Sequence, residues 1–426
     1  MKVMLIGGGG REHALAWKIA SSPLVEKLVC VPGNPGMAQV AECVSMGASD
    51  LEALKSWAVS NRIDLTVIGP EAPLVAGLAD HFRASGLAVF GPSQAAAALE
   101  GSKAFMKDLL KRYHIPTAGY QVFTDAAAAL DHVRGQGAPI VVKASGLAAG
   151  KGAMVCHTLE EAEQAVHRAM VQREFGAAGN EVVVEEFLTG EEVSFMAFAD
   201  GERLLPMASA QDHKAVGEGD TGPNTGGMGA YSPAPILTPR LHDRIMVEIM
   251  QPVIDAMAAE GRPYRGVLYA GLMIDGDVLK VLEFNARFGD PETQPLLMRM
   301  RSDIVPFLMA SAVGSLAGMT IDWDPRPAVC VVMAAGGYPG SYAMDHPITG
   351  LESAMSLPDV QIFHAGTRRV GQNLVTAGGR VLGVTGLGDT VTQARKVTYA
   401  AVERIHWQDA YFRGDIAYRA LSREAP

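Results

Sequence analysis

The most informative part of this 426-residue sequence is Val281-Leu282-Glu283-Phe284-Asn285-Ala286-Arg287-Phe288-Gly289-Asp290-Pro291-Glu292. Read as a β-strand, it alternates its side chains between two faces, and one face carries Glu283, Asn285 and Arg287. The other face is apolar and can pack on a core. Mg²⁺ takes oxygen ligands, usually only one or two of them from the protein, so Glu283 and Asn285 are candidate metal ligands. The Arg287 guanidinium suits a carboxylate or a phosphoryl group. An exposed strand with a solvated polar face is the alternative that this stretch alone leaves open.

Composition and charge indicate an ordinary globular protein of several domains. The chain is 48% hydrophobic and 19% charged, with a formal net charge of −10, and it is longer than one core usually organises. The acidic balance argues against a nucleic-acid partner, and the lack of a long apolar stretch argues against a membrane partner. Four scattered cysteines without a Cys-x-x-Cys pair fit reduced thiols and give no zinc site. These features predict a soluble, cytoplasmic protein. We further expect a monomer that acts on small molecules.

The chain divides into three predicted regions. Apolar runs alternate with helical patterns over residues 1–100, which predicts an α/β substrate-binding domain with a parallel sheet covered by helices on both faces. Residues 101–325 are expected to form a larger mixed region, with 119–188 as a small mobile lid, and 326–426 a β-rich closing domain. The expected strands of the first region are 3–6, 28–31, 65–68 and 88–90, and its expected helices lie near 11–20, 51–60, 74–85 and 94–99.

The first predicted strand runs into a glycine-rich turn, Gly7-Gly8-Gly9-Gly10-Arg11-Glu12-His13. A dinucleotide-binding turn has the pattern G-x-G-x-x-G, and the third glycine is missing here. A glycine loop that opens a helix can still offer free backbone N–H groups to an anion. Gly9, Gly10 and Arg11 are therefore candidates for a monophosphate site, and a tight turn packed against the sheet is an equal alternative.

A second glycine-rich segment, Gly146-Leu147-Ala148-Ala149-Gly150-Lys151-Gly152, follows a strand-like run that ends at Lys143. Its spacing is one residue short of a P-loop, and glycine replaces the hydroxyl residue after the lysine. Another strand-like run follows at 153–156, so a mobile flap that closes over phosphates with its backbone N–H groups fits better. Its candidate contacts are Gly146, Gly150, Lys151 and Gly152. Lys143 would point at a phosphate, unless it is merely exposed at a strand end.

Several motifs taken together resemble one known family. Lys103, Lys143, the flap, the run 185–188, Glu192 and Glu283-x-Asn285 occur in an order that resembles the ATP-grasp superfamily. Within it, the chain resembles the glycinamide ribonucleotide synthetase family, the phosphoribosylamine–glycine ligases. The stretches that carry this second resemblance are 8–15, 69–74, 146–152, 211–214, 220–231, 287–292 and 364–367. The resemblance covers essentially the whole chain, and 220–231 and 287–292 are highly specific.

The resemblance implies ATP as co-substrate, with Mg²⁺ or Mn²⁺. By resemblance, Lys103 and Lys143 contact the phosphates, and Glu283 and Asn285 bind the metal. Adenine is contacted by Glu185, Glu186 and Leu188 and lies between the apolar side chains of Phe187 and Leu282. The ribose is bound by Glu192, or by Glu191 as a near-equal candidate. Two features depart from the family pattern. Ser145 stands where an aspartate is usual, which puts the capping of the flap in doubt. Residues 269–273 lack the third metal carboxylate of many relatives, so two protein ligands are expected.

The implied reaction activates a carboxylate and then forms an amide. By resemblance, glycine attacks the γ-phosphate of ATP to give glycyl phosphate, and the amine of 5-phosphoribosylamine then displaces phosphate to give glycinamide ribonucleotide in de novo purine synthesis. Arg287 and Lys143 are the expected catalytic residues, with Arg287 on the glycine carboxylate or on the phosphoryl group. The other substrate candidates are Asp290 for the glycine ammonium, Glu71 for the sugar hydroxyls, Gly9, Gly10 and Arg11 for the sugar phosphate, and Asp212, Lys214, Asn224, Thr225, Gly226 and Gly227 for a pocket. The run 221–229 is expected to be neither a helix nor a regular strand.

Three other functions stay open at this point. Another ATP-grasp ligase, using formate or carbonate, would share the ATP half of the site. A nucleotide-binding regulatory protein would need no turnover, and Lys143 together with the metal strand argues against it. An NAD-dependent oxidoreductase is disfavoured by the incomplete glycine pattern.

Overall fold

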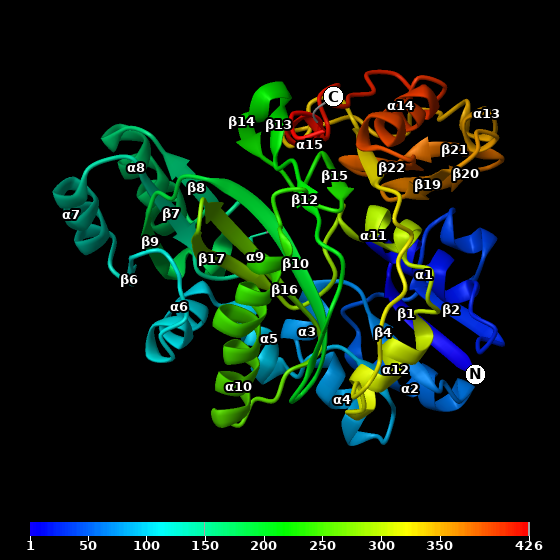
Figure 1. The fold of residues 1–426 in the computed structure, drawn as a ribbon, viewed down its shortest axis with the longest axis horizontal. Coiled ribbons are helices and arrows are strands. Elements are labelled where there is room, and N and C mark those ends of the chain that lie inside the picture. The colour runs from blue at the N-terminus through cyan, green and yellow to red at the C-terminus, as the bar shows by residue number, and fades with distance from the viewer. Residues whose placement is uncertain (149, 425–426) are drawn as a thin grey trace.

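A computed structural model of the protein describes residues 1–148 and 150–424, and Ala149 of the flap and the last two residues of the closing region lie outside this range (Figure 1). The N-terminal region is a five-stranded sheet in the order β3-β2-β1-β4-β5, and all its strands are parallel. Its elements are β1 (Lys2–Gly7), α1 (Gly10–Ala20), β2 (Lys27–Pro32), β3 (Glu42–Cys43), α2 (Leu51–Asn61), β4 (Leu65–Ile68), α3 (Glu71–Val75), α4 (Leu78–Ala84), β5 (Val89–Phe90) and α5 (Gln94–Gly101). The predicted parallel sheet is confirmed. The single helix expected near 74–85 is wrong, because Gly77 takes a left-handed φ of 88° between α3 and α4.

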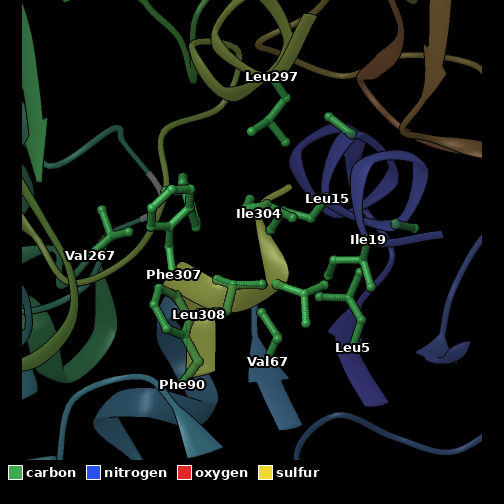
Figure 2. Packing of buried hydrophobic residues seen from close by; sticks show 14 of the residues in the cluster. Leu5, Leu15, Ile19, Val67, Phe90, Val267, Leu297, Ile304, Phe307 and Leu308 are labelled. Atoms are coloured by element: carbon green, nitrogen blue, oxygen red, sulfur yellow. The ribbon is translucent and has the colours of Figure 1, made fainter. Parts of the chain in front are cut away.

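Both faces of this sheet are buried, as a parallel sheet requires. Val3 and Leu5 of β1 point to one side, and Met4 and Ile6 point to the other. Helices α2, α3 and α4 cover the second side. The first side is covered by α1 and by α12 (Val305–Val313), which comes from far along the chain and packs against β5 (Figure 2). This packing holds the N-terminal sheet against the central region.

The lid is a separate four-stranded sheet in the order β6-β9-β7-β8, which lies at the left of Figure 1. Its elements are β6 (Tyr120–Phe123), α7 (Ala126–Gln136), β7 (Ile140–Ala144), β8 (Ala153–Cys156), α8 (Leu159–Val166), η2 (His167–Val171), η3 (Gly176–Asn180) and β9 (Val182–Glu186). Strands β7 and β8 are antiparallel. The flap is therefore the loop of a hairpin, as predicted.

The central sheet has the order β11-β10-β16-β17 and packs against a group of helices. Its elements are α6 (Lys103–Arg112), β10 (Glu191–Asp200), β11 (Leu204–Pro206), α9 (Pro239–Ile245), η5 (Met246–Met250), α10 (Gln251–Ala259), β16 (Arg265–Asp275), β17 (Val278–Asn285) and α11 (Thr293–Arg299). Strand β17 ends at Asn285. Arg287, expected to continue that strand, lies in the segment that follows it.

The closing sheet has the order β12-β15-β18-β22-β19 and takes two strands from earlier in the chain. Its strands are β12 (Gln211–Asp212), β15 (Gly229–Ser232), β18 (Ala328–Ala334), β19 (Val360–His364) and β22 (Arg380–Leu387), and β20 (Thr367–Val370), β21 (Asn373–Thr376), α13 (Leu351–Met355), α14 (Val391–Val402) and α15 (Tyr418–Leu421) complete the region. The predicted fold class, a parallel-sheet N-terminal domain followed by a mixed region and a β-rich closing domain, is confirmed. The sheets outside the N-terminal domain are antiparallel. No helix in the described residues is long and apolar enough to cross a membrane.

The glycine-rich run 221–229 differs from its prediction. Residues Thr221–Asn224 form β14, which pairs with β13 (Ala215–Gly217), and a short helix η4 (Glu218–Asp220) joins them. The expectation that this run contains no regular strand is therefore wrong. The hairpin has a register shift between Ala215 and Gly217, and the segment between β14 and β15 remains irregular.

Candidate active site

One cavity of about 450 Å³ is lined by the lid, the central sheet, the N-terminal region and the closing sheet. The predicted site residues that line it are Arg11, Glu71, Lys103, Lys143, Gly150, Gly152, Glu185, Glu186, Phe187, Leu188, Glu192, Asp212, Lys214, Asn224, Thr225, Gly226, Leu282, Glu283, Asn285, Arg287 and Asp290. The structure thus brings the predicted nucleotide, metal and substrate residues together. The predicted residues that are not among the described residues lining it are Gly9, Gly10, Gly146, Lys151, Glu191 and Gly227.

Strand β17 carries an irregularity where it meets the cavity. The register between β16 and β17 shifts next to Gly271, which leaves Leu282 as an extra residue in β17. A β-bulge of this kind re-aims side chains. Leu282 and Glu283 both line the cavity here, although strict alternation would separate them. The Leu282 carbonyl also accepts a hydrogen bond from Lys143 Nζ at 3.2 Å.

Two lysines and one glutamate form the polar base of the predicted nucleotide side. Glu185 of β9 is 2% exposed, and its Oε2 accepts from Lys143 Nζ at 3.0 Å and from Lys107 Nζ at 2.9 Å. Its Oε1 is buried and has no hydrogen-bond partner in the part of the chain that the structure describes. Lys107, on α6, was not predicted, because a lysine in a helix resembles an ordinary surface residue.

Glu283 and Asn285 present oxygen donors to the same cavity from β17. Burial alone would raise the pKa of Glu283, but Lys214 and Lys143 hold that pKa below its ordinary value, so the carboxylate is ionised. The described residues contain no group of three or more His, Cys, Asp or Glu that could enclose a metal ion. Two oxygen donors with positive neighbours fit Mg²⁺ or Mn²⁺ that takes its other ligands from phosphates. They do not fit a metal enclosed by protein alone.

Adjacent residues on β10 point in opposite directions. Glu192 lines the cavity and makes an ion pair with Lys214. Glu191 instead accepts from Arg423 Nη1 at 3.0 Å, near the C-terminus. Both glutamates were candidates for binding the ribose. Only Glu192 lines the cavity, so the expectation that Glu191 is a near-equal candidate is corrected.

Asp212 belongs to the same charged cluster. Its Oδ1 lies 3.7 Å from Lys214 Nζ. Burial raises the pKa of Asp212 above its ordinary value; Lys214 opposes this shift, and the nearby carboxylates of Glu292 and Glu192 add to it.

Arg287 is held between two carboxylates. Its Nε lies 3.3 Å from Glu71 Oε2, and its Nη2 lies 3.0 Å from Glu100 Oε1. Burial alone would lower the pKa of Arg287, but Glu100 and Glu71 outweigh it and raise that pKa. The guanidinium is therefore charged and fixed in orientation. Glu71, predicted as a sugar ligand, already binds Arg287, and Glu100 was missed although it also accepts from the Ala286 N–H at 2.7 Å.

The closing domain contributes Arg380, the first residue of β22. Its Nη2 lies 3.0 Å from Asp290 Oδ2, and its Nη1 donates to the carbonyl oxygens of Asp290, at 2.7 Å, and Gly226. Burial alone would raise the pKa of Asp290, but Arg380 and Arg11 hold it below its usual range. Arg380 was missed because it lies 90 residues from Asp290 along the chain. It ties the predicted glycine site to the glycine-rich loop.

The N-terminal glycine loop is closed by its own helix. The Gly9 N–H donates to Glu12 Oε2 at 2.7 Å, and Glu12 Oε1 lies 2.5 Å from Arg11 Nε. The expectation that Gly9 offers a free N–H to a phosphate is therefore wrong, because the Glu12 carboxylate already binds there. Gly9 lines a second hollow of about 320 Å³ that shares residues with the main cavity. Gly10 packs on Gln294, whose Nε2 would lie 2.9 Å from a Cβ atom at that position.

The flap is tied to its surroundings on both sides. Lys151, expected to contact phosphates, donates from Nζ to the Pro339 carbonyl of the closing domain at 3.1 Å. Gly146 packs against η3 of the lid. Ser145 is buried, and its Oγ accepts the Ala104 N–H at 3.2 Å. This serine joins the base of the flap to α6.

Comparisons with known proteins agree with this geometry. Models of the phosphoribosylglycinamide synthetase N domain, ATP-grasp (A) domain and C domain match residues 1–100, 101–293 and 328–419. The phosphoribosylamine–glycine ligase of Allochromatium vinosum is 57% identical over 427 residues, which is 100% of both chains. The crystal structure of phosphoribosylamine–glycine ligase from Thermotoga maritima has a TM-score of 0.85 and 31% identity, over 98% of this chain and 100% of that one.

A more distant structure shares the fold alone. The biotin carboxylase domain of the 2-oxoglutarate carboxylase from Hydrogenobacter thermophilus is 17% identical with a TM-score of 0.73, over 96% of this chain and 91% of that one. The resemblance found in the sequence is confirmed by these matches. The chain belongs to the phosphoribosylglycinamide synthetase family.

Proposed function

We propose that the protein ligates glycine to 5-phosphoribosylamine using ATP, and that the products are glycinamide ribonucleotide, ADP and phosphate in de novo purine synthesis. Use of ATP follows from the ATP-grasp domain, and the substrates follow from the ligase name of full-length relatives. The observation that carries the proposal is the single cavity that joins a nucleotide side to Arg287, Asp290 and Arg380. Those three residues have charges suited to the carboxylate and ammonium groups of an amino acid.

Phosphoryl transfer from ATP to the glycine carboxylate builds charge that the chain compensates with fixed cations. Lys143 keeps one N–H free after its bonds to Glu185 and Leu282, and we assign that N–H to a phosphate oxygen. Lys103, which lines the same wall, is assigned to the phosphates as well. Mg²⁺ or Mn²⁺, held by Glu283 and Asn285, would reduce the negative charge of the phosphates when bound.

Arg287 is assigned to the oxygens of the glycyl group as they pass from carboxylate to acyl phosphate. Its fixed guanidinium needs no reorganisation during the reaction. In the second step the amine of phosphoribosylamine attacks the acyl carbon, the C–O bond to phosphate breaks, and the nitrogen loses a proton. The departing phosphate is a base that can take up that proton, and Asp212, which lines the cavity, stays assigned to the substrate pocket. Asp290 is assigned to the glycine ammonium.

The setting of the reaction is proposed on the same basis. The partners are small molecules only, and the enzyme acts as a monomer in the cytoplasm. A net charge of −10 and four free cysteines support this setting. The domain boundaries near residues 100 and 325 likewise remain a proposal.

Phosphate release measured with ATP, glycine and phosphoribosylamine tests the proposal. We expect release that depends on both glycine and the amine, with glycinamide ribonucleotide identified by mass. Release that does not depend on glycine, or that depends on formate or carbonate instead, would refute the substrate assignment.

A further inference from the structure

Lys107 lies behind the predicted nucleotide site. It is 0% exposed, and its Nζ donates to Thr117 Oγ1 at 2.8 Å and to Glu185 Oε2 at 2.9 Å. The Thr117 hydroxyl in turn donates to the Val281 carbonyl of β17 at 2.7 Å. Lys107 therefore joins α6, the lid strand β9 and, through Thr117, the strand that carries the proposed metal ligands.

A single carboxylate oxygen serves two ammonium groups in this arrangement. Glu185 Oε2 lies 3.0 Å from Lys143 Nζ as well as 2.9 Å from Lys107 Nζ. Two positive charges and one negative charge leave the group with a net positive charge. Lys143 lines the cavity, whereas Lys107 is buried behind Glu185. The surplus charge is therefore available on the cavity side, where Lys143 is assigned to ATP phosphates.

We propose that Lys107 is a positioning residue for the nucleotide: it neutralises Glu185 from behind, so that Lys143 keeps its charge for the phosphates. The inference rests on the proposed function in that the ligand is taken to be an adenine nucleotide. Without Lys107, Lys143 would be the only cation paired with Glu185. Because Glu185 is buried, its carboxylate would then form a one-to-one ion pair with Lys143, and the pair would have no net charge.

The affinities for ADP and for adenosine distinguish this role from a purely structural one. Removing one charge about 7–10 Å from a phosphate, at an effective dielectric constant of about 20, weakens binding by about 15- to 50-fold. Lys107→Met should show that loss for ADP with Mg²⁺ and a change of less than about threefold for adenosine, which has no phosphate. In turnover, KM for ATP should rise while KM for glycine stays unchanged. Lys111→Met, on the same helix but exposed, is the matched control and should change neither affinity.

A double-mutant cycle tests whether Lys107 acts through Glu185. In Glu185→Gln no carboxylate remains for Lys107 to neutralise, because the Lys107 ammonium is paired with Glu185 Oε2. Lys107→Met added to Glu185→Gln should then change ADP affinity by less than about threefold. Where Lys107→Met does not fold, Lys107→Gln keeps a polar group without the charge and should give the same loss.

The proposal is overturned if either Lys107 variant binds ADP as the wild type does, if ADP and adenosine lose affinity equally, or if the loss persists in Glu185→Gln. The binding arms need no turnover. A wild-type enzyme without glycine-dependent phosphate release would therefore refute the proposed function while the role of Lys107 could still be judged.

Discussion

Replacing Arg380 should weaken the protein and the acceptor half of the site together. Arg380→Met removes an ion pair to Asp290 and hydrogen bonds to the carbonyl oxygens of Asp290 and Gly226. Breaking a fully buried pair from one side costs about 3–5 kcal/mol. The two side chains are 21% and 17% exposed, so we expect about 2–3 kcal/mol in the free energy of unfolding.

The pH dependence of this loss has a definite sign. The folded pKa of Asp290 is held below its usual value by Arg380 after the opposing effect of burial. The pair therefore contributes stability above the unfolded pKa and loses it as pH falls through the folded pKa. Wild type and Arg380→Met should differ most near pH 7 and should converge as the solution is acidified below about pH 4.

Urea unfolding at several pH values and steady-state kinetics check these expectations. The double variant Arg380→Met/Asp290→Asn should recover part of the stability, because no unpaired carboxylate remains. We expect kcat/KM for glycine to fall by about 10- to 100-fold and KM for ATP to change by less than about twofold. Arg369→Met, an exposed arginine of the same domain, is the matched control. A loss below about 0.5 kcal/mol that does not vary with pH, or a rise confined to KM for ATP, would refute the reasoning.

Three further predictions concern other parts of the site and the fold. Glu192→Gln should raise KM for ATP by about tenfold and Glu191→Gln by less than about twofold, because only the former lines the cavity; equal effects would contradict the assignment of Glu192. Glu283→Gln should reduce kcat by at least about 100-fold in a protein that still folds, and an unchanged rate would remove the metal assignment. His13, buried and facing His364, has its pKa lowered by burial to about 3. The unfolded chain therefore binds more protons below about pH 6.5, and stability falls on acidification by up to about 1.4 kcal/mol per pH unit. His13→Gln should flatten that slope in urea unfolding, and an unchanged slope would contradict the burial of a neutral imidazole.

The elements that sequence could predict are those whose signal is local. The alternation of apolar runs with helical patterns led to the parallel N-terminal sheet, and the hairpin around the flap followed from the strand-like runs on either side of it. The helix expected near 74–85 is divided at Gly77, which has a left-handed φ. The spacing of hydrophobic residues does not reveal such a backbone conformation. Strands β12 and β15 join the closing sheet, and nothing in the local sequence predicts this. Strands of two and four residues are too short to show an alternation of apolar and polar side chains.

The site shows the same division between local and long-range signals. The polar face of the 281–292 stretch was sufficient to select Glu283 and Asn285, but alternation separates Leu282 from Glu283 and misses the bulge that unites them. Lys107 and Arg380 were missed because each acquires its importance from a partner 78 or 90 residues away. The prediction for Gly9 was wrong because its N–H donates to the Glu12 carboxylate, and Glu12 belongs to the same glycine-rich motif. A pattern shows which residues are present, but not which of them have already found partners.

The transfer of oxygen from glycine to phosphate tests the central claim most directly. Glycine labelled with ¹⁸O in its carboxylate is incubated with the enzyme, ATP and phosphoribosylamine, and the inorganic phosphate released is analysed by mass spectrometry. If the carboxylate attacks the γ-phosphate and glycyl phosphate forms, each phosphate released carries one ¹⁸O atom from glycine. Phosphate without the label, released together with product, would contradict activation of glycine as an acyl phosphate.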